Sequence, residues 1–244
     1  MAKTLIQLAN EVGKNLRRST GTTYTTVTQN ADVIFIIQAI NEAKRMVEDA
    51  WESDLLVKAL TFTSSAGVHT YDLSDLAVVT SDPDVATDRS AILRSKNDYR
   101  ILAFDVTDNE FQLNECSREY AQKQETLDTT TVAIPSLVSI YPNANGLTVH
   151  FPYAPSGARN YKIYCKVPQD DLTAADDELT VPWRVVVLAA TAIAVEERGE
   201  ELGMEASRWW EQYESALGSM IAREGYEHDF TLVPETTDYM NPWS

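Results

Sequence analysis

The side chains with the most obvious chemistry are three histidines, His69, His150 and His228. A zinc site needs imidazoles, thiolates or carboxylates that converge on one point. These three fall in a predicted turn, on one face of a predicted strand and in the C-terminal segment, without a metal-binding spacing. We therefore expect ordinary surface histidines, and we predict neither a metal ion nor another cofactor.

Two acidic clusters suggest calcium, which prefers carboxylate oxygens. The first holds Asp82, Asp84 and Asp88, but the glycine and the terminal glutamate of an EF-hand loop are both missing. The second, within residues 170–178, precedes a predicted helix, where acidic side chains complement the helix dipole. We interpret both clusters as solvated turns without a metal.

Common enzyme motifs are also missing from the sequence. Gly13-Lys14 matches the end of a phosphate-binding loop, but Leu8 and Asn15 stand where that loop has glycine and Ser or Thr. The sequence contains neither the G-x-S-x-G of serine hydrolases nor the H-E-x-x-H of zinc proteases. Paired glycosidase carboxylates are defined by their separation in space, so a sequence cannot reveal them. We predict no catalytic residue and a protein that is not an enzyme.

Aromatic side chains gather at Phe151, Tyr153, Tyr161 and Tyr164. Such rings could stack on sugars or bases, which keeps a carbohydrate-binding or hydrolytic β-domain open as an alternative. Strands also favour aromatic residues for packing alone, and the alternation of this segment turns half of the rings inward. We therefore favour a role in the core and at an interface.

The net charge of −17 is concentrated toward the C-terminus, where residues 170–244 carry four arginines, no lysine and 17 acidic side chains. Such a surface repels phosphate, which argues against tight nucleic-acid binding through this part. Cys116 and Cys165 have no metal or redox spacing, so we expect reduced thiols. The longest apolar run, which starts at Val185, is about half of what a bilayer requires, so we expect no membrane segment.

The spacing of apolar residues predicts two helices in the N-terminal part. The first spans about residues 5–18 and follows a capping box made by Thr4 and Gln7. The second spans about residues 31–54, with Asn30 as its cap. Its apolar stripe places the charged residues of the helix, Lys44 and Glu48 among them, on the solvent side.

Two more helices are predicted near the C-terminus, one from Pro182 to about residue 198 and one at about residues 204–224. Trp209 and Trp210 are adjacent in the last helix and therefore point about 100° apart. Only one of them can lie centrally on the stripe that faces the other helices. Both are therefore candidates for a subunit interface.

Residues 226–244 form a predicted extended arm, which lacks the period of a helix or a strand. A disordered tail normally has few large apolar residues, whereas this segment has many. We expect it to dock onto a partner, and the alternative is an arm that folds back on its own domain. The residues expected to make that contact are Phe230, Leu232, Val233, Pro234, Tyr239, Met240 and Trp243.

Between residues 60 and 168 the apolar period changes to that of strands. We predict a hairpin around residues 64–67, further strands near residues 99–120, and a three-stranded meander that ends near Val167. Asn145-Gly146 predicts a type I′ turn within this meander.

The helices at the two ends are too few to bury themselves separately. We therefore predict an α+β fold in which residues 1–59 and 169–225 form one helical bundle. The β-rich domain of residues 60–168 is inserted between them, and the arm of residues 226–244 follows.

The ordered pattern resembles the head–tail adaptor proteins of tailed bacteriophages, in particular the tail tubular protein A type of short-tailed phages. The N-terminal segments that carry the resemblance are LIQLANEVGKNL, AINEAKRMVEDAWESD and ALTFTSSAGVHTYDLS, where Ser74 replaces a proline that is common in the family. The segment NGLTVHFPYAPSGARNYKIYCKVPQDDLTAADDELTVPW is similar to the family's next block, although Pro152 and Pro155 are more widely spaced. The closing helix adds Ala206, Trp209, Tyr213, Ala216 and Leu217.

The resemblance implies a structural role. Proteins of this type form a ring, usually twelve-fold, beneath the portal protein of the capsid. They extend the channel for double-stranded DNA and carry the tail tube or nozzle protein and sometimes tail fibres, while the C-terminal arm often docks onto the portal. The expected location is the virion neck, after synthesis in the host bacterial cytoplasm. Another tail structural protein, such as a nozzle or tail-completion protein, remains the alternative.

Overall fold

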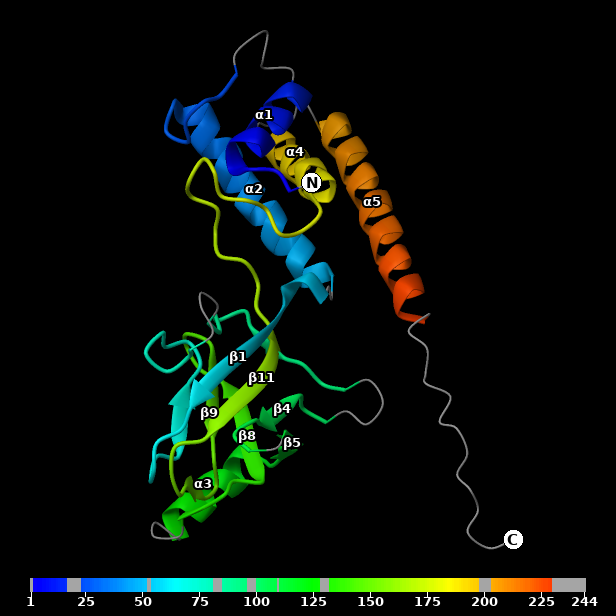
Figure 1. Ribbon diagram of the computed structural model, residues 1–244. Coiled ribbons are helices and arrows are strands. Elements are labelled where there is room, and N and C mark those ends of the chain that lie inside the picture. Colours follow the sequence, from blue (N-terminus) through cyan, green and yellow to red (C-terminus); the bar gives the residue numbers. More distant parts are fainter. Residues whose placement is uncertain are drawn as a thin grey trace, which may run out of the picture. The chain divides into compact units, whose positions relative to one another are not determined.

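The computed structural model describes residues 2–16, 23–51, 54–80, 85–95, 100–108, 110–127, 132–197 and 203–229. The fold is α+β, which confirms the predicted class. The chain divides into two compact units (Figure 1), a helical unit of residues 1–53 and 170–244 and a sheet unit of residues 54–169.

The helical unit is organised around α4 (Trp183–Glu196), of whose 14 residues ten are buried. The sequence WRVVVLAATAIAVE is apolar almost all round, and a helix of that kind has to be covered on every side. The helices α1 (Leu5–Asn15), α2 (Ala31–Ala50) and α5 (Gly203–Asp229) each pack against it. The core of this unit therefore combines residues from both ends of the chain.

The helices begin where the sequence predicts. The Gln7 side chain accepts a hydrogen bond from the Thr4 N–H at 3.2 Å, as a capping box requires. Asn30 Oδ1 accepts from the Val33 N–H at 2.9 Å and so caps α2. Pro182 immediately precedes the first turn of α4, which confirms the predicted start.

The ends of α2 and α5 differ from the prediction. The helix α2 ends at Ala50 because Trp51 adopts an extended backbone, with φ −124° and ψ 115°. The helix α5 continues past Gly225 to Asp229, so residues 226–229 belong to it and not to the arm. One glycine costs a helix only about 1 kcal/mol relative to alanine, which is too little to end it.

Part of the predicted solvent face of α2 is buried. Lys44 and Glu48 are both fully buried, with 3.6 Å between Lys44 Nζ and Glu48 Oε1. Lys44 Nζ also donates to the Asp170 carbonyl at 3.0 Å, and Asn41 bonds the N–H and the C=O of Leu172 at 2.9 and 3.1 Å. The segment that follows the sheet unit therefore lies on α2 and covers its polar residues.

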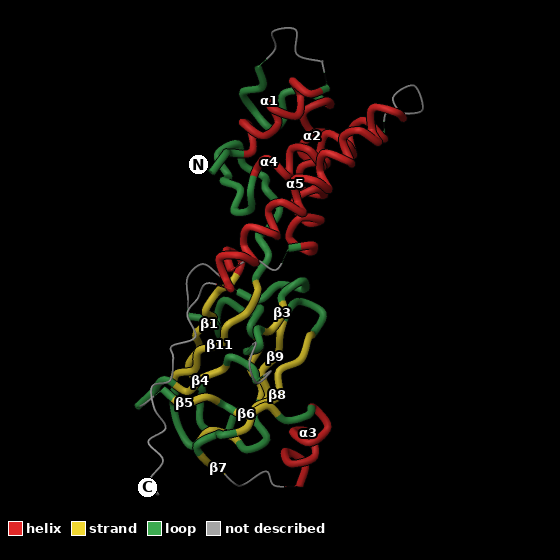
Figure 2. The backbone as a smooth tube through the Cα atoms, turned by 90° about the vertical axis from the view of Figure 1, so that its right-hand side faces the viewer, coloured by secondary structure: helices red, strands yellow, loops and turns green. Residues whose placement is uncertain are grey.

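Within the described residues, the strands form three sheets (Figure 2). The first holds β1 (Val57–Thr63), β11 (Asn160–Lys166), β4 (Ala103–Asp105) and β5 (Phe111–Gln112), with β3 (Ala91–Ile92) also on β11. The second holds β2 (Thr70–Asp72), β9 (Leu147–His150), β8 (Leu137–Pro142) and β6 (Asn114–Glu115), and the third holds β7 (Val132–Ala133) and β10 (Ala154–Pro155).

The first and last long strands of the sheet unit pair with each other. A short 3-10 turn, Asp54–Leu56, leads into β1, which runs antiparallel to β11 from the Val57–Lys166 pair to the Thr63–Asn160 pair. The two ends of the sheet unit therefore lie side by side, as in a domain inserted into another.

Two predicted strand connections are wrong. The strands β1 and β2 flank the predicted hairpin at residues 64–67, but β1 pairs with β11 whereas β2 pairs with β9. The strands β8 and β9 pair as predicted, but β11 leaves them and joins the first sheet. Pro152 and Pro155 lie between β9 and β11 and have no N–H to donate to a ladder, so the chain changes sheets there.

The turn between β8 and β9 is also not of type I′. It is the four-residue loop 143–146, in which Asn143 Oδ1 accepts from the N–H groups of Asn145 and Gly146 at 2.8 and 2.6 Å. The φ of Gly146 is not positive. The glycine is needed for space, because a Cβ there would lie 2.7 Å from the Ala86 carbonyl oxygen.

The helix α3 (Arg118–Leu127) lies where a strand was predicted to continue. Ala121 is its one buried residue among those described, so the helix has no apolar stripe for periodicity to detect. Its start does have a signal, because Ser117 Oγ accepts from the Tyr120 N–H at 3.2 Å, as an N-cap does. Figure 2 shows α3 beside β8, with which it is in contact.

The core of the sheet unit contains a cluster of four aromatic rings. Phe151 and Tyr161 have 4.9 Å between ring centroids, and Phe62 and Tyr71 have 5.1 Å. Phe151 and Tyr161 are fully buried, which confirms their predicted place in the core and removes them from any surface platform. Burial raises the pKa of the Tyr161 hydroxyl well above its usual value.

Lys44→Met should lower the free energy of unfolding by about 3–5 kcal/mol, because the buried Glu48 carboxylate then loses its cationic partner. The double variant Lys44→Met/Glu48→Leu should recover most of this loss, since it leaves neither charge of the pair buried. Urea unfolding followed by circular dichroism measures both.

Lys14→Met is the matched control for that experiment. Its side chain is 62% exposed and pairs with Glu11 at the surface, so it should change the unfolding free energy by less than about 1 kcal/mol. If Lys44→Met were as stable as this control, the buried pair would not hold α2 as described.

Candidate functional site

The helix α5 carries both tryptophans that the sequence singles out, and both side chains are half-buried. Trp210 Nε1 donates to Glu196 Oε2 at 3.2 Å, and the Trp210 ring meets Tyr213 edge-on with 5.6 Å between centroids. Trp210 therefore ties α5 to the C-terminal end of α4. Trp209 points about 100° away from it around the helix.

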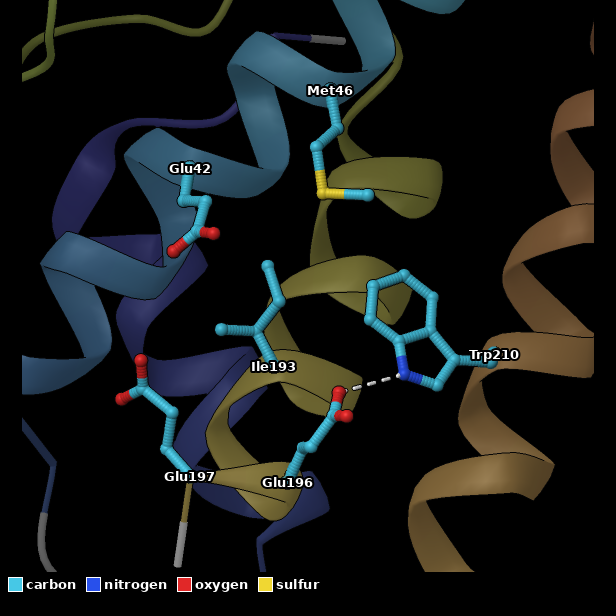
Figure 3. A pocket seen from close by; sticks show the side chains of 6 residues that line it. All are labelled: Glu42, Met46, Ile193, Glu196, Glu197 and Trp210. Atoms are coloured by element: carbon cyan, nitrogen blue, oxygen red, sulfur yellow. Dashed lines mark hydrogen bonds between the residues drawn. The ribbon is translucent and has the colours of Figure 1, made fainter.

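Trp210 also lines an open hollow of about 340 Å³ between α2, α4 and α5. Figure 3 shows Met46 and Trp210 pointing toward each other beside Ile193, with three carboxylates around them. The lining residues are Glu42, Met46, Ile193, Glu196, Glu197 and Trp210. An apolar floor with an acidic rim suits a partner surface that presents an apolar side chain next to Lys or Arg.

The second acidic cluster is a turn, as the sequence predicts. Asp177 Oδ2 accepts the N–H groups of Thr173 and Ala174 at 2.6 and 2.7 Å, which holds the pKa of this carboxyl below its usual value. In the first cluster, Asp88 is exposed. Asp82 and Asp84 lie outside the described residues.

The remaining reactive groups have structural surroundings. Gly13 and Lys14 lie within α1, and Lys14 pairs with Glu11 at 3.3 Å, which is not the arrangement of a phosphate-binding loop. Cys116 and Cys165 are free thiols, as expected. Burial raises the pKa of the Cys165 thiol to about 12, so it stays protonated and unreactive.

The expectation of dispersed surface histidines is wrong for His69 and His150. His150 is only 2% exposed, and 6.3 Å separates the centroids of the two rings. Glu125 of α3 completes a cluster with them. Sequence reasoning missed this cluster because it depends on the pairing of β2 with β9 and on α3. His228 lies in the last turns of α5.

The residues expected to bind the portal all lie outside the described part of the chain, so their role stays a prediction. They are Phe230, Leu232, Val233, Pro234, Tyr239, Met240 and Trp243. Among the helices that the structure describes, none has the length and apolar character needed to cross a membrane.

Comparison with curated proteins gives no match. Residues 3–238 match the family described as SU10 adaptor protein, which covers nearly all of the 244 residues and includes both units. The match confirms the resemblance to bacteriophage head–tail adaptors. That family is one of structural phage adaptors and is not an enzyme family. With its helical and sheet units together, the chain belongs to the SU10 adaptor protein family.

Proposed function

We propose that this protein is a ring-forming adaptor of the virion neck, which joins the capsid portal to the tail or nozzle and extends the DNA channel. The observation that carries the proposal is the family match over residues 3–238. The two compact units support it, because separate cores offer separate surfaces for unlike partners.

The helical unit would make the contacts between copies in the ring. Trp209 is a half-buried tryptophan on α5, and tryptophan is enriched where interfaces concentrate their binding energy. The hollow beside Trp210 offers a neighbouring copy an apolar floor with carboxylates at its rim. A neighbour that brings an apolar side chain next to a cation would complement it.

The arm would bind the portal. Residues 230–244 combine several large apolar side chains with two acidic residues and no Lys or Arg. Like charges would repel this segment from the acidic hollow of the helical unit, which favours docking onto a different protein. An extended apolar segment that orders on a partner is a common mode of recognition.

The acidic character of the chain would suit the lining of a DNA channel. Residues 170–244 carry 17 acidic side chains against four arginines. A surface of that kind repels phosphate, so double-stranded DNA could slide past it without sequence-specific binding. The sheet unit, with its rigid aromatic core, would receive the nozzle or tube protein and, where present, the tail fibres.

Trp209→Ala should reduce the number of copies that assemble with the portal ring, because the side chain is assigned to the contact between copies. Trp210→Ala should reduce assembly too, because Trp210 lines the hollow assigned to the neighbouring copy, and it should also lower the unfolding free energy by about 2 kcal/mol, since it loses the bond to Glu196 and the ring contact with Tyr213. Thermal unfolding and analytical ultracentrifugation with portal rings separate the two effects. Wild-type assembly by Trp209→Ala would contradict the interface assignment.

Removing residues 230–244 should abolish binding to the portal ring while leaving α5, which ends at Asp229, whole. The variant F230S/Y239S/W243S should weaken binding by roughly tenfold or more, because aromatic anchors dominate interface energies. Cosedimentation with purified portal rings measures this loss.

The variant T231S/T236S/T237S is the control in the same segment and should bind like the wild type. Undiminished binding by the truncated chain would refute the arm assignment. If the wild type bound the nozzle protein and not the portal, the protein would be a tail component instead.

A further inference from the structure

Two histidines and one glutamate converge at the end of the second sheet. His69 immediately precedes β2, His150 is the last residue of β9, and Glu125 lies on α3. One potential ligand atom from each residue lies within 4.8 Å of the other two. They come from three elements far apart in the sequence, so the fold and not a local motif assembles them.

The strand pairing fixes the two histidines relative to each other. Thr70 of β2 lies opposite His150 of β9 in the antiparallel ladder. The next pair continues the ladder, because the Phe151 N–H donates to the His69 carbonyl at 2.9 Å. The backbones of both histidines are therefore held by the same ladder, which fixes where their side chains start.

The hydrogen bond of His69 leaves its Nε2 free to bind a ligand. His69 Nδ1 lies 2.9 Å from the Phe151 carbonyl oxygen. A carbonyl only accepts, so Nδ1 carries the hydrogen and Nε2 presents its lone pair. Histidines that bind metals typically donate their other ring N–H to a carbonyl or carboxylate in this way.

One ring nitrogen of the buried His150 lacks a partner. The residue is 2% exposed, and its Nδ1 has no hydrogen-bond partner among the residues that the structure describes. Its Nε2 lies 3.0 Å from Glu125 Oε2. Buried polar groups are almost always satisfied, so this imidazole indicates a further ligand.

Arg118 lies over the Tyr141 ring, 4.2 Å from its centroid. The carboxylate of Glu125 is the anionic group of the cluster.

We propose that His69, Glu125 and His150 bind a zinc ion that fastens α3 to the second sheet. Two imidazoles and one carboxylate, with a fourth position for water, form a ligand set typical of zinc. Calcium and magnesium prefer oxygen ligands throughout. Zinc–ligand distances of about 2.0–2.2 Å place tetrahedral ligands about 3.3 Å apart, and the Glu125 side chain, 43% exposed, has room to turn inward.

A metal at this place would have a clear structural role. The one buried residue that α3 contributes among those described is Ala121, so apolar packing holds this helix only weakly to the sheet. A shared ion would tie α3 to β2 and β9 at once. The inference concerns the sheet unit alone and does not depend on the role of the protein in the virion.

The test is titration of the chelator-treated full-length protein with Zn²⁺ by calorimetry. We expect one ion per chain and a higher unfolding temperature with Zn²⁺, because a ligand of the folded state stabilises it. Cobalt should give the visible absorption bands of a tetrahedral site. Loss of an outer-shell partner costs metal affinity about 10–100-fold, so Glu125→Gln, which loses a ligand, should weaken binding by roughly a hundredfold or more.

The test uses the variants Glu125→Gln and His69→Gln, because a substitution of the buried His150 could unfold the chain. Circular dichroism checks that both variants are folded. His228→Gln, on α5, is the matched control and should keep full binding. The proposal is overturned if the wild type binds no Zn²⁺, or if Glu125→Gln and His69→Gln bind it as the wild type does.

Discussion

The burial of α4 is the constraint on which the rest of the helical unit depends. This helix is apolar on almost all sides, and ten of its 14 residues are buried, so several helices have to surround it. The chain supplies α1 and α2 from before the sheet unit and α5 from after it. The segment between α2 and α4 must therefore leave the helical core and return to it. The pairing of β1 with β11 brings the two ends of the sheet unit together.

Local signals predicted the helices of this unit well, because each one is defined by contacts close in sequence. The Asn30 side chain marks the start of α2 by accepting a hydrogen bond from Val33, three residues along the chain. Pro182 marks the start of α4 through its own restricted φ. The prediction that Lys44 faces solvent is wrong because its burial depends on Asp170, which is distant in sequence. The sheets are explained in the same way. The alternation of apolar and polar residues predicts the strands, but pairing between distant segments decides that β11 joins β1.

The candidate sites also depend partly on local signals and partly on contacts between distant segments. Composition and adjacency pointed to Trp209 and Trp210, but only the fold shows that Trp210 bonds Glu196 and lines a hollow. The cluster of His69, Glu125 and His150 could not be predicted, because it requires one strand pairing and a polar helix that has no apolar stripe. In both units, the residues suited to binding lie where separate elements meet around a rigid core.

We propose that many copies of this chain assemble on a portal. The most direct measurement is the native mass of the purified protein, alone and after mixing with the portal ring of the same phage. We expect a portal complex heavier by one complete ring of copies of the chain, formed in a fixed stoichiometry. An unchanged portal mass, with the same small species in both samples, would contradict it.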